Sequence, residues 1–166
     1  GLTKKVGDDI RWIGEVRLVE GALELPLRWR KPRRIFVNSM SDLFHEKVHE
    51  SWVARIFNVM REAEQHTFQV LTKRPARMLE VLSRWNASTS LGNGYGWVTR
   101  PLSNVWLGVS VEDQATADER IPLLLQTPAA ARFVSYEPAL AAVDFSKFLP
   151  HALGGCCSSS HEPPDT

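Results

Sequence analysis

The sequence predicts an α/β fold in which strands and helices alternate around a parallel sheet. Two observations support this prediction. Short apolar runs of strand length recur along the chain, and segments with apolar residues at three- and four-residue spacing separate them. Strands that alternate with helices indicate parallel pairing, because each helix returns the chain to the edge where the previous strand began. We expect one domain over residues 1–150 and a disordered tail, rich in Pro and small residues, over residues 151–166.

The expected elements follow one another from residue 34 onward. Residues 16–27 mix apolar and acidic side chains without a clear period and predict only a weak helix or an irregular lead-in. The four expected strands are short, largely apolar runs within residues 34–40, 66–75, 104–112 and 131–140. The three expected helices show helical periodicity and cover residues 48–63, 75–85 and 113–126. A Gly-, Ser- and Asn-rich stretch, residues 86–104, predicts a long loop.

Composition and charge exclude several classes of protein. Of the 166 residues, 43% are hydrophobic and 23% are charged, which is ordinary for a globular domain and excludes collagen and coiled coil. The net charge of +1 gives no overall attraction to nucleic acid. Apolar runs of the length that a membrane span or a signal peptide needs are absent from the sequence, so we expect a cytoplasmic protein without a membrane partner. The two cysteines, Cys156 and Cys157, are adjacent and cannot build a disulfide framework.

Polar and charged residues follow each of the four expected strands. In parallel α/β folds the ligand site lies at the carboxyl ends of the strands. The candidate ligand-binding residues at these ends are Asn38, Ser39, Asp42, Thr72, Lys73, Arg74, Ser110, Glu112 and Glu137. The alternative is that these residues only end strands and cap helices, as Asp42, Thr72 and Asp113 could do. Capping, however, does not require Lys73 and Arg74 together with two glutamates.

The segment His45-Glu46-Lys47-Val48-His49 matches the H-E-x-x-H pattern of zinc peptidases. In those enzymes two imidazoles one helical turn apart bind the metal, and the glutamate activates water. Here the segment directly follows the loop after a strand, and the third ligand would have to be Glu64 or His66. We therefore expect His45 and His49 to be exposed residues at the start of a helix and zinc not to be bound, with a metallopeptidase as the weaker alternative.

A basic segment, Arg28-Trp-Arg-Lys-Pro-Arg-Arg34, precedes the first expected strand. Five basic residues in seven, with an aromatic ring among them, could hold a phosphate backbone and stack on a base. More often such a segment is a solvated approach to a strand. Nucleotide or nucleic-acid binding through residues 28–34 is thus a second alternative.

Three blocks of the sequence carry a resemblance to a known family. KPRRIFVNSMSDLFHEKV (31–48), FQVLTKRPARM (68–78) and NVWLGVSVEDQATADERIPLLLQTPAAARFVSYEPAL (104–140) resemble successive blocks of a family of uncharacterised bacterial and phage-associated proteins, commonly labelled phage Gp-type proteins. The resemblance covers roughly residues 28–142. It implies a radical S-adenosylmethionine-like protein on a partial (β/α) barrel, whose full-length members carry a three-cysteine motif for a [4Fe–4S] cluster.

The chain departs from that family pattern at two places. A three-cysteine motif does not precede the matched blocks, so no ligands for the cluster are present, and the sequence after Gly155 reads as an unrelated tail. We therefore expect a truncated copy that is catalytically inactive by itself and holds no cofactor. The strand-end residues would then form a remnant ligand site.

Geometry predicts how that site is arranged. Right-handed crossovers release all parallel strands at one edge, so Asp42, Lys73, Arg74, Glu112 and Glu137 should converge. Cations opposite carboxylates suit a zwitterionic ligand such as an amino-acid-bearing nucleotide. Lys73 or Arg74 would contact its carboxylate or phosphate, and Glu112 or Glu137 its amine or ribose hydroxyls.

Overall fold

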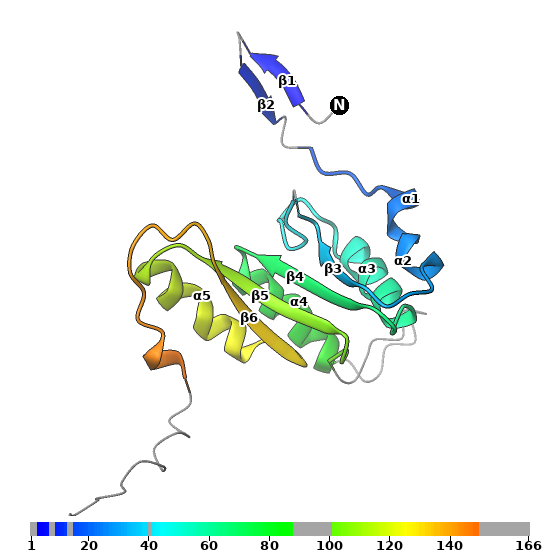
Figure 1. The fold of residues 1–166 in the computed structure, drawn as a ribbon. Helices are drawn as coiled ribbons and strands as arrows, with labels where there is room; N and C mark the ends of the chain where they lie inside the picture. Colours follow the sequence, from blue (N-terminus) through cyan, green and yellow to red (C-terminus); the bar gives the residue numbers. More distant parts are fainter. Residues whose placement is uncertain (1–2, 7–8, 13–14, 40, 88–100, 150–166) are drawn as a thin grey trace, which may run out of the picture.

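A computed structural model describes residues 3–6, 9–12, 15–39, 41–87 and 101–149 (Figure 1). Its main feature is a four-stranded, all-parallel sheet whose strands lie in the order β3-β4-β5-β6. The strands span Arg34–Val37 (β3), Thr67–Thr72 (β4), Val105–Val111 (β5) and Ala131–Tyr136 (β6). The expected α/β class is therefore confirmed. The sheet is not closed, and β3 and β6 form its two edges.

Three helices of equal length connect the strands. They span Glu50–Glu62 (α3), Pro75–Ala87 (α4) and Gln114–Gln126 (α5). Because each strand is paired with the next one in the sequence, right-handed crossovers place all three helices on the same face of the sheet. Figure 1 shows them side by side along that face. The opposite face carries no helix among the described residues.

The core lies between the sheet and the helices. Alternate strand residues point to opposite faces, and the buried ones on β4 and β5 include Phe68, Val70, Leu107 and Val109. The helices contribute buried apolar residues to the same cluster, which are Val53, Met60, Met78, Val81, Ala117, Ile121 and Leu124. Burial of this one stripe of each helix on the sheet fixes the layered arrangement.

The helix-free face of the sheet is only half covered. Register pairing aligns Phe36, Gln69 and Trp106 across three strands, and Leu71 with Gly108 and Phe133 one step further along. The phenyl ring of Phe133 lies over Gly108, where a Cβ atom would be only 2.5 Å from the ring. Glycine at this position therefore permits the close approach of the ring to the β5 backbone.

The strands end earlier than the sequence predicts. The expected strand 34–40 ends at Val37, because Asn38 adopts a left-handed backbone with φ 58°, and the expected strand 131–140 ends at Tyr136, before the turn that contains Pro138. The expected helix 48–63 begins at Glu50. The helix predicted over 75–85 extends to Ala87, and residues 88–100 of the expected loop lie outside the described residues.

The segment before β3 is more structured than predicted. Thr3–Val6 (β1) and Asp9–Trp12 (β2) pair as an antiparallel hairpin, which lies away from the main sheet (Figure 1). The lead-in contains two one-turn helices, Glu20–Leu23 (α1) and Leu25–Arg28 (α2). After β6 the chain runs past α5 and forms a short 3-10 helix, Ser146–Phe148 (η1). The expected tail over residues 151–166 lies outside the described residues.

Every helix within the described residues is too short or too polar to cross a bilayer.

Candidate functional site

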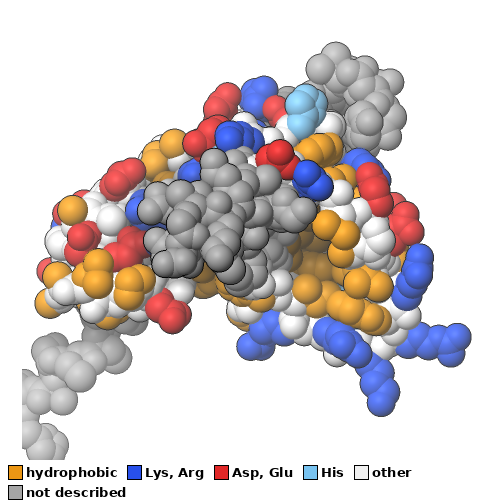
Figure 2. Space-filling model, turned by 90° about the horizontal axis from the view of Figure 1, so that it is seen from above, with side chains coloured by type: hydrophobic (Ala, Val, Ile, Leu, Met, Phe, Trp, Pro, Cys, Tyr) orange, Lys and Arg blue, Asp and Glu red, His pale blue; other side chains and the backbone are white. Residues whose placement is uncertain are grey.

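The carboxyl ends of β3, β4 and β5 bring charged side chains into one hydrogen-bonded network. We call it the carboxyl-edge cluster; its members are Asp42, Glu46, Thr72, Lys73, Arg74, Glu112 and Arg120. Figure 2 views the molecule from above and shows side chains of both charges intermingled on part of this face. The cluster has two centres, one at Asp42 and the other at Glu112.

Asp42 is the hub of the first centre. Its Oδ1 accepts hydrogen bonds from Thr72 Oγ1 at 2.7 Å and from the Phe44 amide at 2.9 Å. Its Oδ2 accepts from the Lys73 amide at 3.1 Å and from Arg74 Nη1 at 3.0 Å. Both carboxylate oxygens are therefore occupied, and Asp42 ties the loop after β3 to the loop after β4. Asp42 is thus not the cap of α3, a role that the sequence had allowed for it.

Arg74 extends this centre toward the surface. Its Nε donates to Glu46 at 2.8 Å, so the guanidinium lies between two carboxylates. Burial alone would lower the pKa of Arg74, but the hydrogen bonds to Glu46 and Asp42 outweigh it and raise the pKa. The guanidinium is thus held in place as a permanent cation.

Glu112 is the hub of the second centre. Its Oε1 accepts from Lys73 Nζ at 2.5 Å, and its Oε2 accepts from Arg120 Nη1 at 2.9 Å. Burial raises the pKa of Glu112, but the hydrogen bond from Lys73 and the charges of Arg120 and Lys73 together hold the pKa below its ordinary value. The Glu112 side chain is 10% exposed and that of Lys73 is 53% exposed, so a buried anion faces a cation that reaches solvent.

The start of α5 positions Glu112. Asp113 caps this helix, as the capping alternative had it: its side chain accepts from the Thr116 amide at 2.8 Å, and the Thr116 hydroxyl accepts from the amides of Glu112 and Asp113 at 3.0 Å. This capping box fixes the backbone at the end of β5. Arg120, two turns into the helix, also donates to the Ser110 carbonyl at 2.8 Å. Its buried Nε has no hydrogen-bond partner among the described residues.

Other predicted site residues are at the same edge but outside the network. Asn38 bonds through its backbone carbonyl to Ser41, and Ser39 is exposed beside it. Ser110 is buried, and Arg120 binds its carbonyl oxygen. Glu137 is exposed after β6 and has no ion pair with the cluster among the described residues. The structure thus joins Asp42, Thr72, Lys73, Arg74 and Glu112, but not these four.

Sequence reasoning missed two arginines that hold the site together. Arg120 binds Glu112, and Arg77 donates to the carbonyl oxygens of His45 and Val48, which fastens the loop before α3. A signal for Arg120 was present, because it directly precedes Ile121 on the buried stripe of α5. A charged residue next to the apolar stripe of a helix requires a partner at the core.

The HEKVH segment does not form the helical zinc motif. Residues 45–49 precede α3, and His49 is the N-cap of that helix, where its Nδ1 accepts from the Ser51 amide at 3.3 Å. His45 Nδ1 accepts from the Lys47 amide at 3.1 Å. The two imidazoles therefore serve backbone turns instead of sharing one helical face. Within the described residues, no three His, Cys, Asp or Glu side chains form a group that could hold a metal ion.

The basic segment, residues 28–34, lies at the opposite, amino edge of the sheet. Arg33 stacks over the Trp29 ring at 4.6 Å, and Arg34 over the Trp106 ring at 5.4 Å. Arg28 forms a 3.7 Å ion pair with Glu24. In the described part of the chain, Arg30, Lys31, Arg33 and Arg34 make no ion pair with a carboxylate. This segment and the carboxyl-edge cluster are therefore separate sites.

Comparison with protein families gives a match to the chain over residues 3–162. The chain belongs to the family described as Protein of unknown function (DUF5131). The matched range includes every strand and helix that the structure describes, so the cluster and the basic segment both belong to the family region. The resemblance to an uncharacterised family is confirmed at this level. Searches of curated proteins and of solved structures found no match.

Proposed function

We propose that this chain binds a zwitterionic, amino-acid-bearing nucleotide such as S-adenosylmethionine at the carboxyl-edge cluster. The observation that carries the proposal is the Lys73–Glu112 pair, in which a solvent-reaching cation meets a buried anion at the ends of β4 and β5. A zwitterion can insert between these two groups. Its carboxylate takes the place of Glu112 beside Lys73, and its ammonium takes the place of Lys73 beside Glu112, so every charge stays paired.

The rest of the cluster favours Lys73 as the group that moves. Arg74 is held by two carboxylates, and Glu112 is held by Arg120 and by the capping box of α5. Lys73 has a flexible side chain and, of the three cations in the cluster, the largest exposed fraction. The fixed groups form a preorganised frame, and the lysine exchanges partners at little cost in free energy.

The helix-free face of the sheet supports the nucleoside part of the proposal. Phe133 is half-buried on this face, three residues before the end of β6. Aromatic rings on an open sheet stack favourably with a purine. The ligand would thus have its amino-acid end at the cluster and its base on the sheet.

From the resemblance to radical S-adenosylmethionine proteins, this proposal takes over only the binding of the nucleotide and not the iron–sulfur cluster. A [4Fe–4S] cluster requires three thiolates, and the two cysteines of this sequence, Cys156 and Cys157, do not supply them. The residues do not fit that group, and we derive no radical step. In this proposal the chain binds the nucleotide but does not activate it.

Isothermal titration calorimetry with S-adenosylmethionine tests the proposal. We expect binding to the native protein and at least a tenfold loss of affinity in Lys73→Met and in Glu112→Gln, because each variant leaves one end of the zwitterion without its partner. Lys147→Met is the matched control. Lys147 is about as exposed as Lys73 and forms an ion pair of the same length, 2.5 Å, with Asp118 on α5. Absence of binding to the native protein, or an equal loss in the control, would contradict the proposal.

The basic segment supports a second candidate function, the binding of single-stranded nucleic acid. The observation that favours it is the group of cations around Trp29 and Trp106 that have no carboxylate partner in the described part of the chain. Fluorescence anisotropy with a labelled oligonucleotide at several salt concentrations tests it. Binding that weakens steeply with salt and is lost in Arg30→Gln/Lys31→Gln would support this function. Salt-independent or absent binding would exclude it.

A further inference from the structure

The outermost strands of the parallel sheet are β3 on one side and β6 on the other. The most exposed large apolar side chains of the described residues lie on these two sides of the molecule. On the β3 side these are Val19, Leu25, Leu27 and Phe36. On the β6 side they are Leu125, Tyr136, Leu140 and Leu149. In Figure 1 the two groups belong to opposite ends of the molecule, with α1, α2 and β3 at one end and α5, β6 and η1 at the other. The central elements β4, β5 and α4 contribute no residue to either group.

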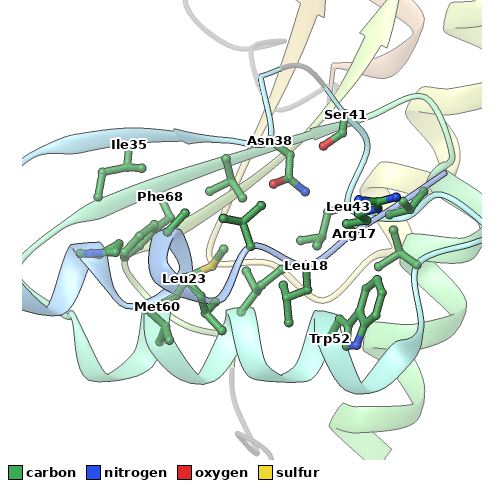
Figure 3. A pocket seen from close by; sticks show the side chains of 18 of the residues that line it. Arg17, Leu18, Leu23, Ile35, Asn38, Ser41, Leu43, Trp52, Met60 and Phe68 are labelled. Atoms are coloured by element: carbon green, nitrogen blue, oxygen red, sulfur yellow. The ribbon is translucent and has the colours of Figure 1, made fainter. Parts of the chain in front are cut away.

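The β3 side is also hollow. A cavity of about 570 Å³ lies between the lead-in segment, β3 and α3, and Leu18, Leu23, Ile35 and Trp52 line it (Figure 3). Its walls are mainly apolar, with Asn38 and Ser41 at the end nearest the carboxyl edge. Apolar surface of this extent, beside a strand without a second partner, is typical of a surface that another polypeptide covers.

The backbone of β3 is suited to further pairing. The Thr67 amide donates to the Arg33 carbonyl at 2.9 Å, and Arg34 is in register with Thr67. In a parallel ladder alternate residues bond to the same neighbour, so Ile35 and Val37 bond to β4 and the N–H of Phe36 points to the open edge. An exposed edge with an outward N–H group is a template for one more parallel strand.

We propose that the occupant of both edges is a second copy of this chain. β3 of one copy pairs with β6 of the other, and β6 of the first with β3 of the second, around a two-fold axis that coincides with the axis of the resulting barrel. Four consecutive βα-type strands per copy then give eight parallel strands, the number that closes a (β/α) barrel. Two-fold symmetry satisfies both edges at once and leaves none exposed.

The distribution of side chains agrees with this arrangement. The helix-free face, with Phe36, Leu71, Trp106 and Phe133, becomes the interior of the barrel, which side chains normally fill. The other exposed apolar residues of the two sides meet in the outer layer: Val19, Leu25 and Leu27 of one copy face Leu125, Tyr136, Leu140 and Leu149 of the other. The carboxyl-edge clusters of both copies lie around the same rim, so the ligand site is shared between the copies.

Sedimentation velocity and native mass spectrometry test the proposal on the full chain. We expect a dimer with twice the 18.7 kDa chain mass at micromolar concentration. A monomer at all concentrations up to about 100 μM, or an assembly larger than a dimer, would overturn the proposal. The first result would show that the edges do not pair between copies of this chain, and the second that they pair without closing.

Two variants, one for each side of the interface, identify the pairing. Phe36→Pro removes the outward N–H of β3 but no bond to β4, and its matched control Phe36→Val keeps that N–H. Leu140→Glu/Leu149→Glu adds charge on the β6 side at residues that are exposed in the single chain. We expect at least a tenfold weaker dimer for each variant alone and near-native association for Phe36→Val. Circular dichroism confirms that each variant is folded.

Mixing the two variants separates this arrangement from pairing of like edges. One interface stays intact in the mixture, because the native β6 side of Phe36→Pro can meet the native β3 side of Leu140→Glu/Leu149→Glu. We therefore expect the mixture to form heterodimers that are tighter than the homodimer of either variant. A mixture that stays monomeric would overturn the β3–β6 pairing, and so would a Phe36→Pro dimer of native strength.

Discussion

The two ends of the parallel sheet use arginine and lysine in opposite ways. At the carboxyl edge the cations meet carboxylates from other loops, and nearly every hydrogen-bonding group has a partner. At the amino edge Arg33 and Arg34 lie on tryptophan rings and have no carboxylate partner among the described residues, and Figure 2 shows a group of Lys and Arg side chains projecting along its lower border. The charged side chains at the carboxyl edge are therefore part of the folded framework, whereas those at the amino edge are exposed to solvent.

The largest expected effect is at the carboxyl edge. Glu112→Leu leaves Arg120 buried without its anion, so we expect the free energy of unfolding to fall by about 3 kcal/mol, measured by urea denaturation. Asp118→Ala is the control, because it breaks the exposed pair with Lys147 and should change stability little. Equal effects of the two substitutions would show that Glu112 has no special role in the framework.

At the amino edge we expect a smaller loss from removal of the aromatic ring. Trp29 packs edge-on against His66 at a centroid distance of 6.0 Å and carries Arg33 on its face. Trp29→Ala should lower the free energy of unfolding by about 2 kcal/mol through lost apolar contact. Trp29→Phe should recover about half of the loss. An unchanged free energy of unfolding in Trp29→Ala would mean that the ring does not anchor the basic segment.

Removal of a stacked cation should have less effect still. Arg33→Gln loses the contact of the guanidinium with Trp29, and at an exposed site we expect a loss of about 0.5 kcal/mol. The free energy of unfolding at 0.05 and 0.5 M NaCl provides the check. A large and salt-sensitive loss would contradict the assignment, since it would indicate a carboxylate partner at the amino edge.

The smallest expected signal is a change in the pH dependence of stability. The lowered pKa of Glu112 means that its contribution is fully present above the ordinary value of 4.5 and is lost as the pH falls through the lower folded-state pKa. In Glu112→Gln the free energy of unfolding should therefore fall less steeply below about pH 4.5. Glu119→Gln, on the exposed side of α5, should keep the native slope. Identical slopes in all three proteins would contradict the ion-pair geometry.

The sequence predicted the main sheet because its strands are apolar on the helix-covered face. It predicted β3 and β6 too long, since polar residues after a strand do not show where the backbone turns; at Asn38 the left-handed φ ends the strand. The β1–β2 hairpin was missed because each strand has only four residues and TKKV has a single apolar side chain, which is too short a pattern to indicate a strand. The start of helix α3 was predicted two residues too early. Apolar periodicity shows which face of a helix is buried but not where the helix begins, and His49 is an unusual N-cap.

Only part of the carboxyl-edge cluster could be predicted. Topology places the ends of β3, β4 and β5 at one edge, so the meeting of Asp42 with Lys73 and Arg74 follows from the order of the elements. Partner choice does not follow from it. Lys73 pairs with Glu112 and not with Glu137 because β4 neighbours β5, and the capping box directs Glu112 inward. Arg120 belongs to a helix, where strand-end reasoning does not look.

His66 makes the position of the lead-in segment visible to spectroscopy. Its buried ring accepts the Arg33 amide at Nδ1, 3.2 Å away, and lies with Nε2 2.9 Å from the Pro26 carbonyl oxygen. Acceptance at Nδ1 places the proton on Nε2, so the docked state contains a single tautomer. In a long-range proton–nitrogen NMR spectrum this imidazole should give two widely separated nitrogen shifts. Detachment of the lead-in segment would move the two nitrogen shifts toward each other. The His66 signal therefore reports whether the lead-in segment is in place as a wall of the β3-side cavity.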